Sequence, residues 1–95
     1  MKLIWSPEAL QDLREVHAYI KKDNPASAKK VVERIVSVVA SQLPENPNIG
    51  RPGRVANTRE FVILGTPFVV PYRTGSGQID ILRVYHAARL WPDNL

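Results

Sequence analysis

The feature that most constrains the fold is a pair of helix start signals, each made of a capping residue followed by proline. Ser6 precedes Pro7, and Asn24 precedes Pro25. Serine and asparagine side chains accept hydrogen bonds from unpaired N–H groups at a helix start, and proline suits the first helical position. Because the second signal ends one helix near Asp23 and begins another at once, it predicts an antiparallel helical hairpin.

Apolar residues recur at helical spacing behind both signals. In the first helix they are Ala9, Leu10, Leu13, Val16 and Ile20. In the second they are Ala28, Val31, Ile35, Val38, Val39 and Leu43, and Pro44 ends the pattern. Polar residues are expected on the other side of the first helix; they are Glu8, Gln11, Asp12, Arg14 and Glu15. Each helix therefore has one face to bury.

The rest of the chain has the pattern of strands and turns. Residues 2–5 predict a short first strand, and residues 44–57, with three prolines and two glycines, predict a long loop. Three strands are expected at 61–64, 67–74 and 78–86, separated by turns at Gly65-Thr66 and Gly75-Ser76-Gly77. Pro71 removes one hydrogen-bond donor from its strand, which indicates an edge position or a bulge. The last strand is apolar on both sides and should lie centrally.

These elements predict an α+β fold in the order β-α-α-β-β-β. The N-terminal helical hairpin should pack on one face of a mainly antiparallel sheet. The chain has 95 residues, enough for one domain, and we expect that domain to span residues 1–95.

The composition narrows the classes of function. There are no cysteines and only two histidines, His17 and His86, so no metal site with recognisable spacing is expected. The sequence suggests no cofactor. No apolar run approaches the roughly 20 residues that span a bilayer. Lys2 is followed by only three apolar residues before Ser6-Pro7, so no signal peptide is predicted and we expect a cytoplasmic protein without membrane contact.

The positive charge changes type along the chain. All five lysines lie within the first 30 residues, whereas every basic residue from position 51 onward is an arginine. Arginine forms bidentate contacts with phosphates and carboxylates, so this half suggests a surface for an anionic partner; a solvated arginine-rich face is the alternative. The candidate target- or nucleic-acid-binding residues are Arg51, Arg54, Arg59, Arg73, Arg83 and Arg89.

Several segments together resemble the RelE/ParE family of bacterial toxins. They are Trp5 to Leu13, Tyr19-Ile20, Asp23 to Pro25, Gly50 to Gly53, Thr58 to Glu60, Pro67 to Val70, Tyr72-Arg73, Ile81 to Arg89 and Trp91-Pro92. The resemblance runs in order over nearly the whole chain, and the family has the fold expected above. It implies the toxin of a type II toxin-antitoxin system, neutralised by a small cognate antitoxin that contacts operator DNA and represses their shared operon.

The resemblance implies two alternative activities. ParE-like members inhibit DNA gyrase, whereas RelE-like members cleave mRNA on the ribosome without a metal. Cleavage would need an acid or base and cations for the phosphorane; His86, Arg83 and Tyr85 are the candidate catalytic residues. RelE-like enzymes carry lysines on the strand that corresponds to residues 61–64, which has none here. The ParE-like branch is therefore favoured.

Other interpretations stay open. His86 either acts in catalysis or binds a backbone group at its strand end, and Arg83 either contacts a target or forms an internal ion pair with Glu60 or Asp80. Trp5 and Trp91 are expected to pack against the domain. A third possible function is a nucleic-acid-binding domain without toxicity, which would bind free nucleic acid in a strongly salt-dependent manner.

Overall fold

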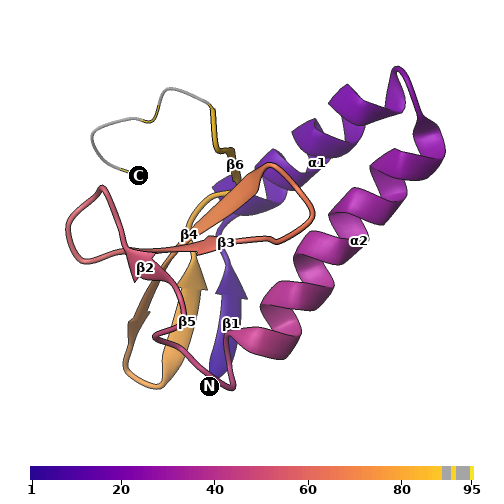
Figure 1. Ribbon diagram of the computed structural model, residues 1–95. Coiled ribbons are helices and arrows are strands. Elements are labelled where there is room, and N and C mark those ends of the chain that lie inside the picture. Colours follow the sequence, from indigo (N-terminus) through magenta and orange to yellow (C-terminus); the bar gives the residue numbers. More distant parts are fainter. Residues whose placement is uncertain (89–90, 92–94) are drawn as a thin grey trace.

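The protein has the α+β architecture that the sequence predicts. The computed structural model describes residues 1–88, 91 and 95. Its elements are β1 (Lys2–Trp5), α1 (Pro7–Lys21), α2 (Pro25–Gln42), β2 (Arg51–Pro52), β3 (Arg59–Val62), β4 (Phe68–Gly75), β5 (Gln78–Ile81) and β6 (Tyr85–His86). Figure 1 shows the two helices side by side on one face of the sheet. Within the described residues, neither helix is long and apolar enough to cross a membrane.

Both helix starts are capped as predicted. The Ser6 hydroxyl accepts a hydrogen bond from the Ala9 N–H at 2.9 Å, and the Asn24 side chain accepts one from the Ser27 N–H at 3.1 Å. Proline occupies the first turn of each helix. The Ser6 hydroxyl also donates to the Leu82 carbonyl at 2.8 Å, so the cap of α1 is tied to the segment after β5.

The sheet is mixed but mainly antiparallel. Its order is β1-β5-β4-β3-β2, and β6 pairs with β4 beyond the end of β5. β1 runs parallel to β5, with Leu3 opposite Ile79, and all other pairings are antiparallel. The sequence correctly predicts β5 as a central strand, because it lies between β1 and β4.

The predicted last strand, 78–86, is divided into two. Tyr72 is opposite Ile81 and Val69 is opposite Tyr85, so the partner of β4 carries one residue more than β4 between these pairs. This is a β-bulge, and it lies beside Pro71. A proline without an N–H is therefore accommodated at a fully buried position of an interior strand, and the bulge alternative is confirmed.

The loop predicted at 44–57 contains a short strand, β2, which pairs with Arg59 and Glu60 of β3. Sequence patterning misses it because its two residues, Arg51 and Pro52, are exposed and show no apolar alternation. β2 is defined by its pairing with β3, the next strand along the chain, and not by its own composition.

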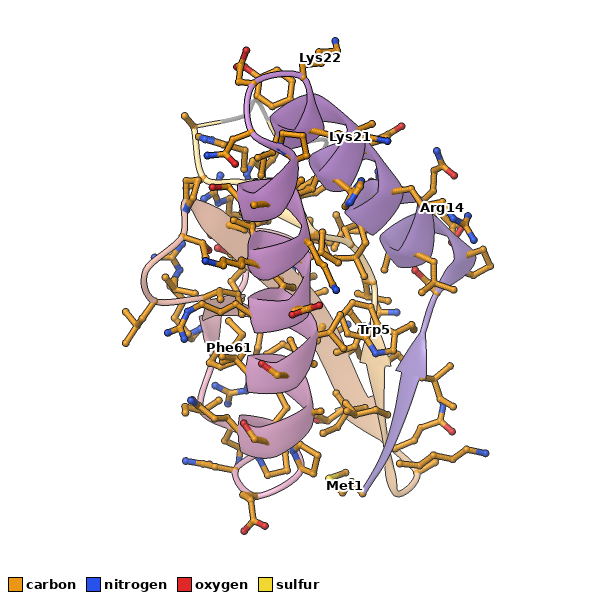
Figure 2. All side chains as sticks on the ribbon, turned by 90° about the vertical axis from the view of Figure 1, so that its right-hand side faces the viewer. Met1, Trp5, Arg14, Lys21, Lys22 and Phe61 are labelled. Carbon is orange, nitrogen blue, oxygen red and sulfur yellow. The ribbon has the colours of Figure 1, made fainter. Side chains whose placement is uncertain are left out.

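The main core lies between the hairpin and the sheet, and Figure 2 looks onto the hairpin from the side opposite the sheet. Trp5, labelled there at the end of β1, packs against this core. The buried core residues are Ala9, Leu13, Val16, Ile35, Val39, Leu43, Phe61, Ile63, Phe68, Val70, Tyr72, Ile79, Ile81 and Val84. On the opposite face of the sheet, Val69, Pro71 and Tyr85 are also buried.

Asp12 was predicted on the polar side of α1, and this is wrong. Its side chain is buried with a relative exposure of 3%, whereas Leu10, expected in the apolar stripe, is 41% exposed. Asp12 lies three residues after Ala9 and four before Val16, so helical geometry places it on the buried face. A carboxylate can lie there because it has a cationic partner.

Candidate functional site

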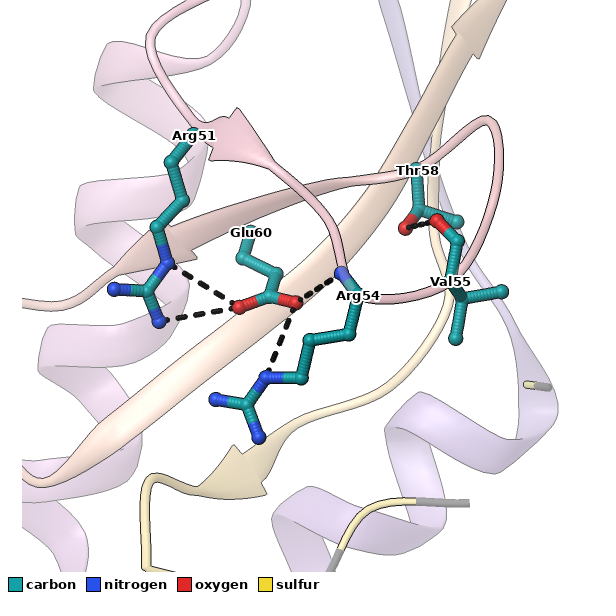
Figure 3. A network of polar contacts seen from close by, with 5 residues as sticks. All are labelled: Arg51, Arg54, Val55, Thr58 and Glu60. Carbon is teal, nitrogen blue, oxygen red and sulfur yellow. Dashed lines mark hydrogen bonds and ion pairs between the residues drawn. The ribbon is translucent and has the colours of Figure 1, made fainter. Parts of the chain in front are cut away.

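The arginines of β2 and of the loop after it gather around one buried carboxylate. Glu60 is only 2% exposed, and Figure 3 shows it between Arg51 and Arg54. Its Oε1 accepts hydrogen bonds from Arg51 at 3.1 and 3.3 Å, and its Oε2 accepts one from the Arg54 backbone N–H at 2.8 Å. The Arg54 guanidinium lies 3.5 Å from the same Oε2. Glu60 thus holds both arginines in place, although about half of each side chain remains exposed.

Two further arginines are held by backbone carbonyls. Arg59 donates to the Gly50 and Asn48 carbonyls at 2.8 and 3.4 Å, and Arg73 donates to the Asn57 carbonyl at 3.3 Å. Both line a polar hollow of about 470 Å³. We call Arg51, Arg54, Arg59 and Arg73 the arginine surface; each is partly exposed and has a protein partner that limits its motion.

The 47–50 segment beneath this surface is fixed by Tyr72. The buried hydroxyl of Tyr72 donates to the Pro47 carbonyl at 2.7 Å and accepts from the Gly50 N–H at 2.9 Å. Burial raises the pKa of Tyr72 above its ordinary value, against smaller lowering effects of the Gly50 hydrogen bond and the Arg59 charge. The neutral phenol therefore holds the segment in place.

Arg83 is not part of the arginine surface. It forms a bidentate ion pair with Asp12, with Nε and one terminal nitrogen 2.8 and 2.9 Å from the two carboxylate oxygens. Asp12 also accepts the backbone N–H of Val84 at 2.9 Å. The hydrogen bond to Asp12 is the main reason that the pKa of Arg83 is raised. The internal ion pair that the sequence suggested for Arg83 is present, but its partner is Asp12 rather than Glu60 or Asp80.

Tyr85 lies under a stack of cationic and aromatic groups. It is 1% exposed, the Arg83 guanidinium carbon is 4.8 Å from its ring centre, and the Trp91 ring is 4.9 Å away. The Arg54 guanidinium carbon lies 3.8 Å from the centre of the Trp91 ring. Trp91 therefore packs against the domain as expected, and a nucleic-acid base has no access to Tyr85 while Trp91 covers it.

His86 is exposed and lies beside an apolar groove. Its ring meets that of Phe68 edge-on at 5.6 Å, and its Nδ1 accepts the Ala88 N–H at 3.1 Å. The groove has a volume of about 420 Å³. Its lining includes Val16, Tyr19, Ile20, Val31, Pro67, Phe68 and Val84, together with His86. The expected hydrogen bond to a backbone group is present, and it leaves Nε2 as the ring nitrogen available to a ligand.

The candidate site residues predicted from the sequence thus lie in separate parts of the structure. His86 lines the apolar groove, whereas Arg83 lines a shallow polar pocket with Glu8, Gln11 and Glu15, and Asp12 borders both. Arg89 lies outside the described residues. Sequence reasoning missed Asp12 and the anchoring role of Glu60. The signal for Asp12 was its place in the stripe of Ala9 and Val16; Glu60 offered no comparable signal, because its partners depend on strand register.

Comparison with known proteins shows which protein family this chain belongs to. The family described as "ParE toxin of type II toxin-antitoxin system, parDE" matches residues 3–91. This chain belongs to the ParE toxin family. It is 45% identical over 94 residues to the "Putative toxin Y4kP" of Sinorhizobium fredii, covering 99% of this chain and 96% of that protein. It is 35% identical over 89 residues to "Toxin RelE2" of Caulobacter vibrioides, covering 94% and 98% of the two chains.

Solved structures agree with the ParE-family fold. The structure described as "Chromosomal ParDE TA system from P. aeruginosa" has a TM-score of 0.83 and 31% identity, covering 90% of this chain and 95% of that one. The "YoeB/ParE toxin from Agrobacterium tumefaciens" has a TM-score of 0.58 at 19% identity, covering 90% and 98%, and supports the fold alone. The ParE-family protein is therefore the toxin of a type II toxin-antitoxin system, and its family implies a cognate antitoxin as partner.

Proposed function

We propose that this toxin blocks growth by binding and inhibiting DNA gyrase, without cutting RNA itself. The observation that carries the proposal is the bidentate pairing of Arg83 with the buried Asp12. RNA cleavage without a metal needs a cation that reaches the negative charge developing on the oxygens of the phosphorane. To do so, Arg83 would have to leave a carboxylate that is only 3% exposed, and abandoning a buried charge costs about 3–5 kcal/mol.

The positions of the other candidate catalytic side chains also favour gyrase inhibition over RNA cleavage. Tyr85 is covered by Trp91, and His86 faces the apolar groove rather than the pocket that Arg83 lines. By contrast, the arginine surface is exposed and held by internal partners. Side chains that are already ordered lose less entropy when they bind, which favours a binding poison that presents cations to an acidic protein surface or to DNA.

The names of the relatives leave the target open. One relative is named as a RelE toxin and one solved structure as a ParDE system. The cognate antitoxin would neutralise the toxin by covering surfaces that the target needs, and it would carry any contact with operator DNA. Ribosome-dependent mRNA cleavage remains the second candidate, with His86 as its acid or base.

A supercoiling assay tests the proposal. Purified toxin is added to DNA gyrase, relaxed plasmid and ATP, and we expect supercoiling to fall and cleaved plasmid to accumulate. The double variant Arg54→Ala with Arg73→Ala should need a higher concentration for the same inhibition. Arg14→Ala, on the exposed side of α1, is the matched control and should behave as the parent.

Undiminished supercoiling at a molar excess of folded toxin would contradict the proposal. In a parallel reaction, purified ribosomes translate a defined mRNA. Cuts at codon boundaries that disappear in His86→Ala would establish the endoribonuclease instead. Binding to free plasmid without inhibition of either machine would favour the simple nucleic-acid-binding domain.

A further inference from the structure

The members of the arginine surface differ in how far their charge is neutralised. Arg51 and Arg54 share the carboxylate of Glu60, so these side chains together carry a single net positive charge. Arg59 and Arg73 are held by backbone carbonyls, which orient a guanidinium but carry no net charge. In the described part of the chain, neither of the two forms an ion pair with a carboxylate. The positive charge of the surface is therefore least compensated at Arg59 and Arg73.

These two arginines line the polar hollow of about 470 Å³, and among the described residues its lining includes no acidic side chain. The apolar groove and the pocket of Arg83, by contrast, both include Asp12 and Glu15. Asp80 lies opposite Arg73 in the pairing of β4 with β5. Its carboxylate accepts a hydrogen bond from the Gln78 side chain at 2.7 Å and leaves Arg73 unpaired. The hollow thus suits an anion.

One wall of the hollow is a tight turn that is already ordered. The Thr58 hydroxyl donates to the Val55 carbonyl at 2.7 Å, as Figure 3 shows, and the Thr58 N–H donates to the same carbonyl at 3.3 Å. Asn57 in this turn has a φ of 63°, a left-handed conformation that asparagine tolerates better than most residues. Its carbonyl accepts the Arg73 Nε. Because the turn and Arg73 hold each other, an anion would meet a guanidinium that is already oriented, which lowers the entropic cost of binding.

The remaining donors fit the oxygens of a phosphate group. Arg73 uses its Nε for the turn, and Arg59 uses one terminal nitrogen for two backbone carbonyls, so each keeps other N–H groups for a ligand. Asn57 and Thr74 are exposed in the lining and add an amide and a hydroxyl. A phosphate group presents several acceptor oxygens around one centre, so it can accept from more than one of these groups. A polar lining with unneutralised arginines is typical of protein–DNA interfaces, whereas the centres of protein–protein interfaces are depleted of charge.

From this geometry we infer that the hollow between Arg59 and Arg73 binds phosphodiester groups in the backbone of duplex DNA. The two guanidinium groups would contact the non-bridging phosphate oxygens, with Asn57 and Thr74 beside them. The inference rests on the proposed gyrase function, because DNA is the substrate of gyrase, and it names DNA rather than an acidic protein surface as the partner of these arginines. Phosphate contacts carry no sequence information, so the site would hold the toxin on any DNA segment that gyrase has bound.

Fluorescence anisotropy with purified toxin tests the inference without gyrase. The probe is a labelled duplex DNA without terminal phosphates, titrated at several salt concentrations. The logarithm of the binding constant should fall linearly with the logarithm of the salt concentration, because binding releases counterions from the phosphates. Arg73→Ala should lower this slope by about one unit and weaken binding about fivefold or more at low salt. Arg14→Ala removes the same charge from the exposed side of α1 and should keep the parental slope.

Further measurements locate the contact and identify the ligand. Arg73→Lys keeps the charge but loses the planar set of donors, so it should keep the slope while binding more weakly. Nuclear magnetic resonance spectra with unchanged amide signals in β3 would verify that the variants are folded. In the parent protein, DNA should shift the amide signals of Asn57 and Thr74. Inorganic phosphate should shift them only at much higher concentration, and a glutamate-rich peptide of equal charge should bind more weakly than DNA.

Three results would overturn the inference. The first is an equal salt slope for the parent, Arg73→Ala and Arg14→Ala. The second is a glutamate-rich peptide that binds as tightly as DNA and is weakened equally by Arg73→Ala, which would assign the arginines to an acidic protein surface. The third is saturation of the hollow by inorganic phosphate without binding of DNA, which would make it a site for free phosphate. Gyrase inhibition combined with any of these results would remove this inference alone, whereas the expected salt slopes without gyrase inhibition would remove only the proposed function.

Discussion

Asp12 of α1 and Arg83, 71 positions later, form a bidentate ion pair that fastens the helical hairpin to the segment between β5 and β6. Asp12 accepts the Val84 N–H as well, so one carboxylate orients the backbone at the bulge. Arg83, which the sequence suggested as a catalytic residue, thus has a structural role in linking these two parts of the fold.

The ion pair predicts a large loss of stability in Asp12→Ala. The variant leaves Arg83 and the Val84 N–H without their acceptor. We expect a loss of about 3 kcal/mol, at the lower end of the range for breaking a buried pair, because a quarter of Arg83 is exposed. Urea unfolding followed by circular dichroism measures it. Glu15→Ala, at an exposed position of the same helix, should change stability by less than about 0.5 kcal/mol; equal effects of the two variants would contradict this role for Asp12.

His86→Ala separates the two candidate activities. The side chain is exposed and its ring contact is with Phe68, so we expect a loss of stability below about 1 kcal/mol. If the toxin acts on gyrase, induced expression of the variant should still arrest growth and trigger the DNA damage response. Loss of growth arrest by a variant with parental stability would instead favour the ribosome as target.

Gly50→Ala should destabilise the 47–50 segment. A Cβ at this position would lie 2.7 Å from Tyr72 Cε1 and 2.9 Å from the Glu60 carbonyl oxygen. Because backbone and a buried ring both limit the space, we expect a cost of about 1–3 kcal/mol in thermal or urea unfolding. Gly75→Ala is the matched control and should be nearly neutral, since a Cβ at that position would have no other atom within 4 Å. A neutral Gly50→Ala would show that the segment adjusts freely.

Tyr72 should make stability fall at alkaline pH. Burial raises its pKa in the folded state above the ordinary value of 10.0, so the folded protein holds the phenol proton more tightly than the unfolded chain. The resulting stabilisation is complete below about pH 10 and is lost as pH rises through the folded pKa. Tyr72→Phe should lower stability at neutral pH, because the Gly50 N–H loses its acceptor, and should flatten the decline above pH 10. Parallel pH profiles for parent and variant would contradict this assignment.

Glu60 should matter more than either arginine that it binds. Glu60→Ala leaves the Arg54 N–H and two guanidinium groups without their carboxylate, and we expect a loss of about 2–4 kcal/mol. Arg51→Ala removes a side chain that is 54% exposed and should cost less than about 1 kcal/mol. Chemical denaturation of the two variants compares them, and a reversed order would mean that the arginines stabilise Glu60 little.

Much of the framework follows from local signals. The caps at Ser6 and Asn24 and the turn at Gly65, which has a φ of 83°, depend on residues a few positions apart. Such interactions can be predicted from the sequence because the groups that interact lie within a few residues of each other. The family resemblance then adds the toxin function.

The site depended on contacts that no local pattern contains. Arg51 meets Glu60 nine residues away, and Arg83 meets Asp12 across most of the chain. Which arginine stays exposed and which becomes a structural cation depends on strand register and on the helix face that the sheet covers. The sequence alone determined the two helices, the longer strands and their order, since capping and periodicity act within a few turns; it missed β2 and the division of the last strand into β5 and β6. Only tertiary packing decided the pairing of charges, because a buried carboxylate needs a partner that folding brings from a distant part of the chain.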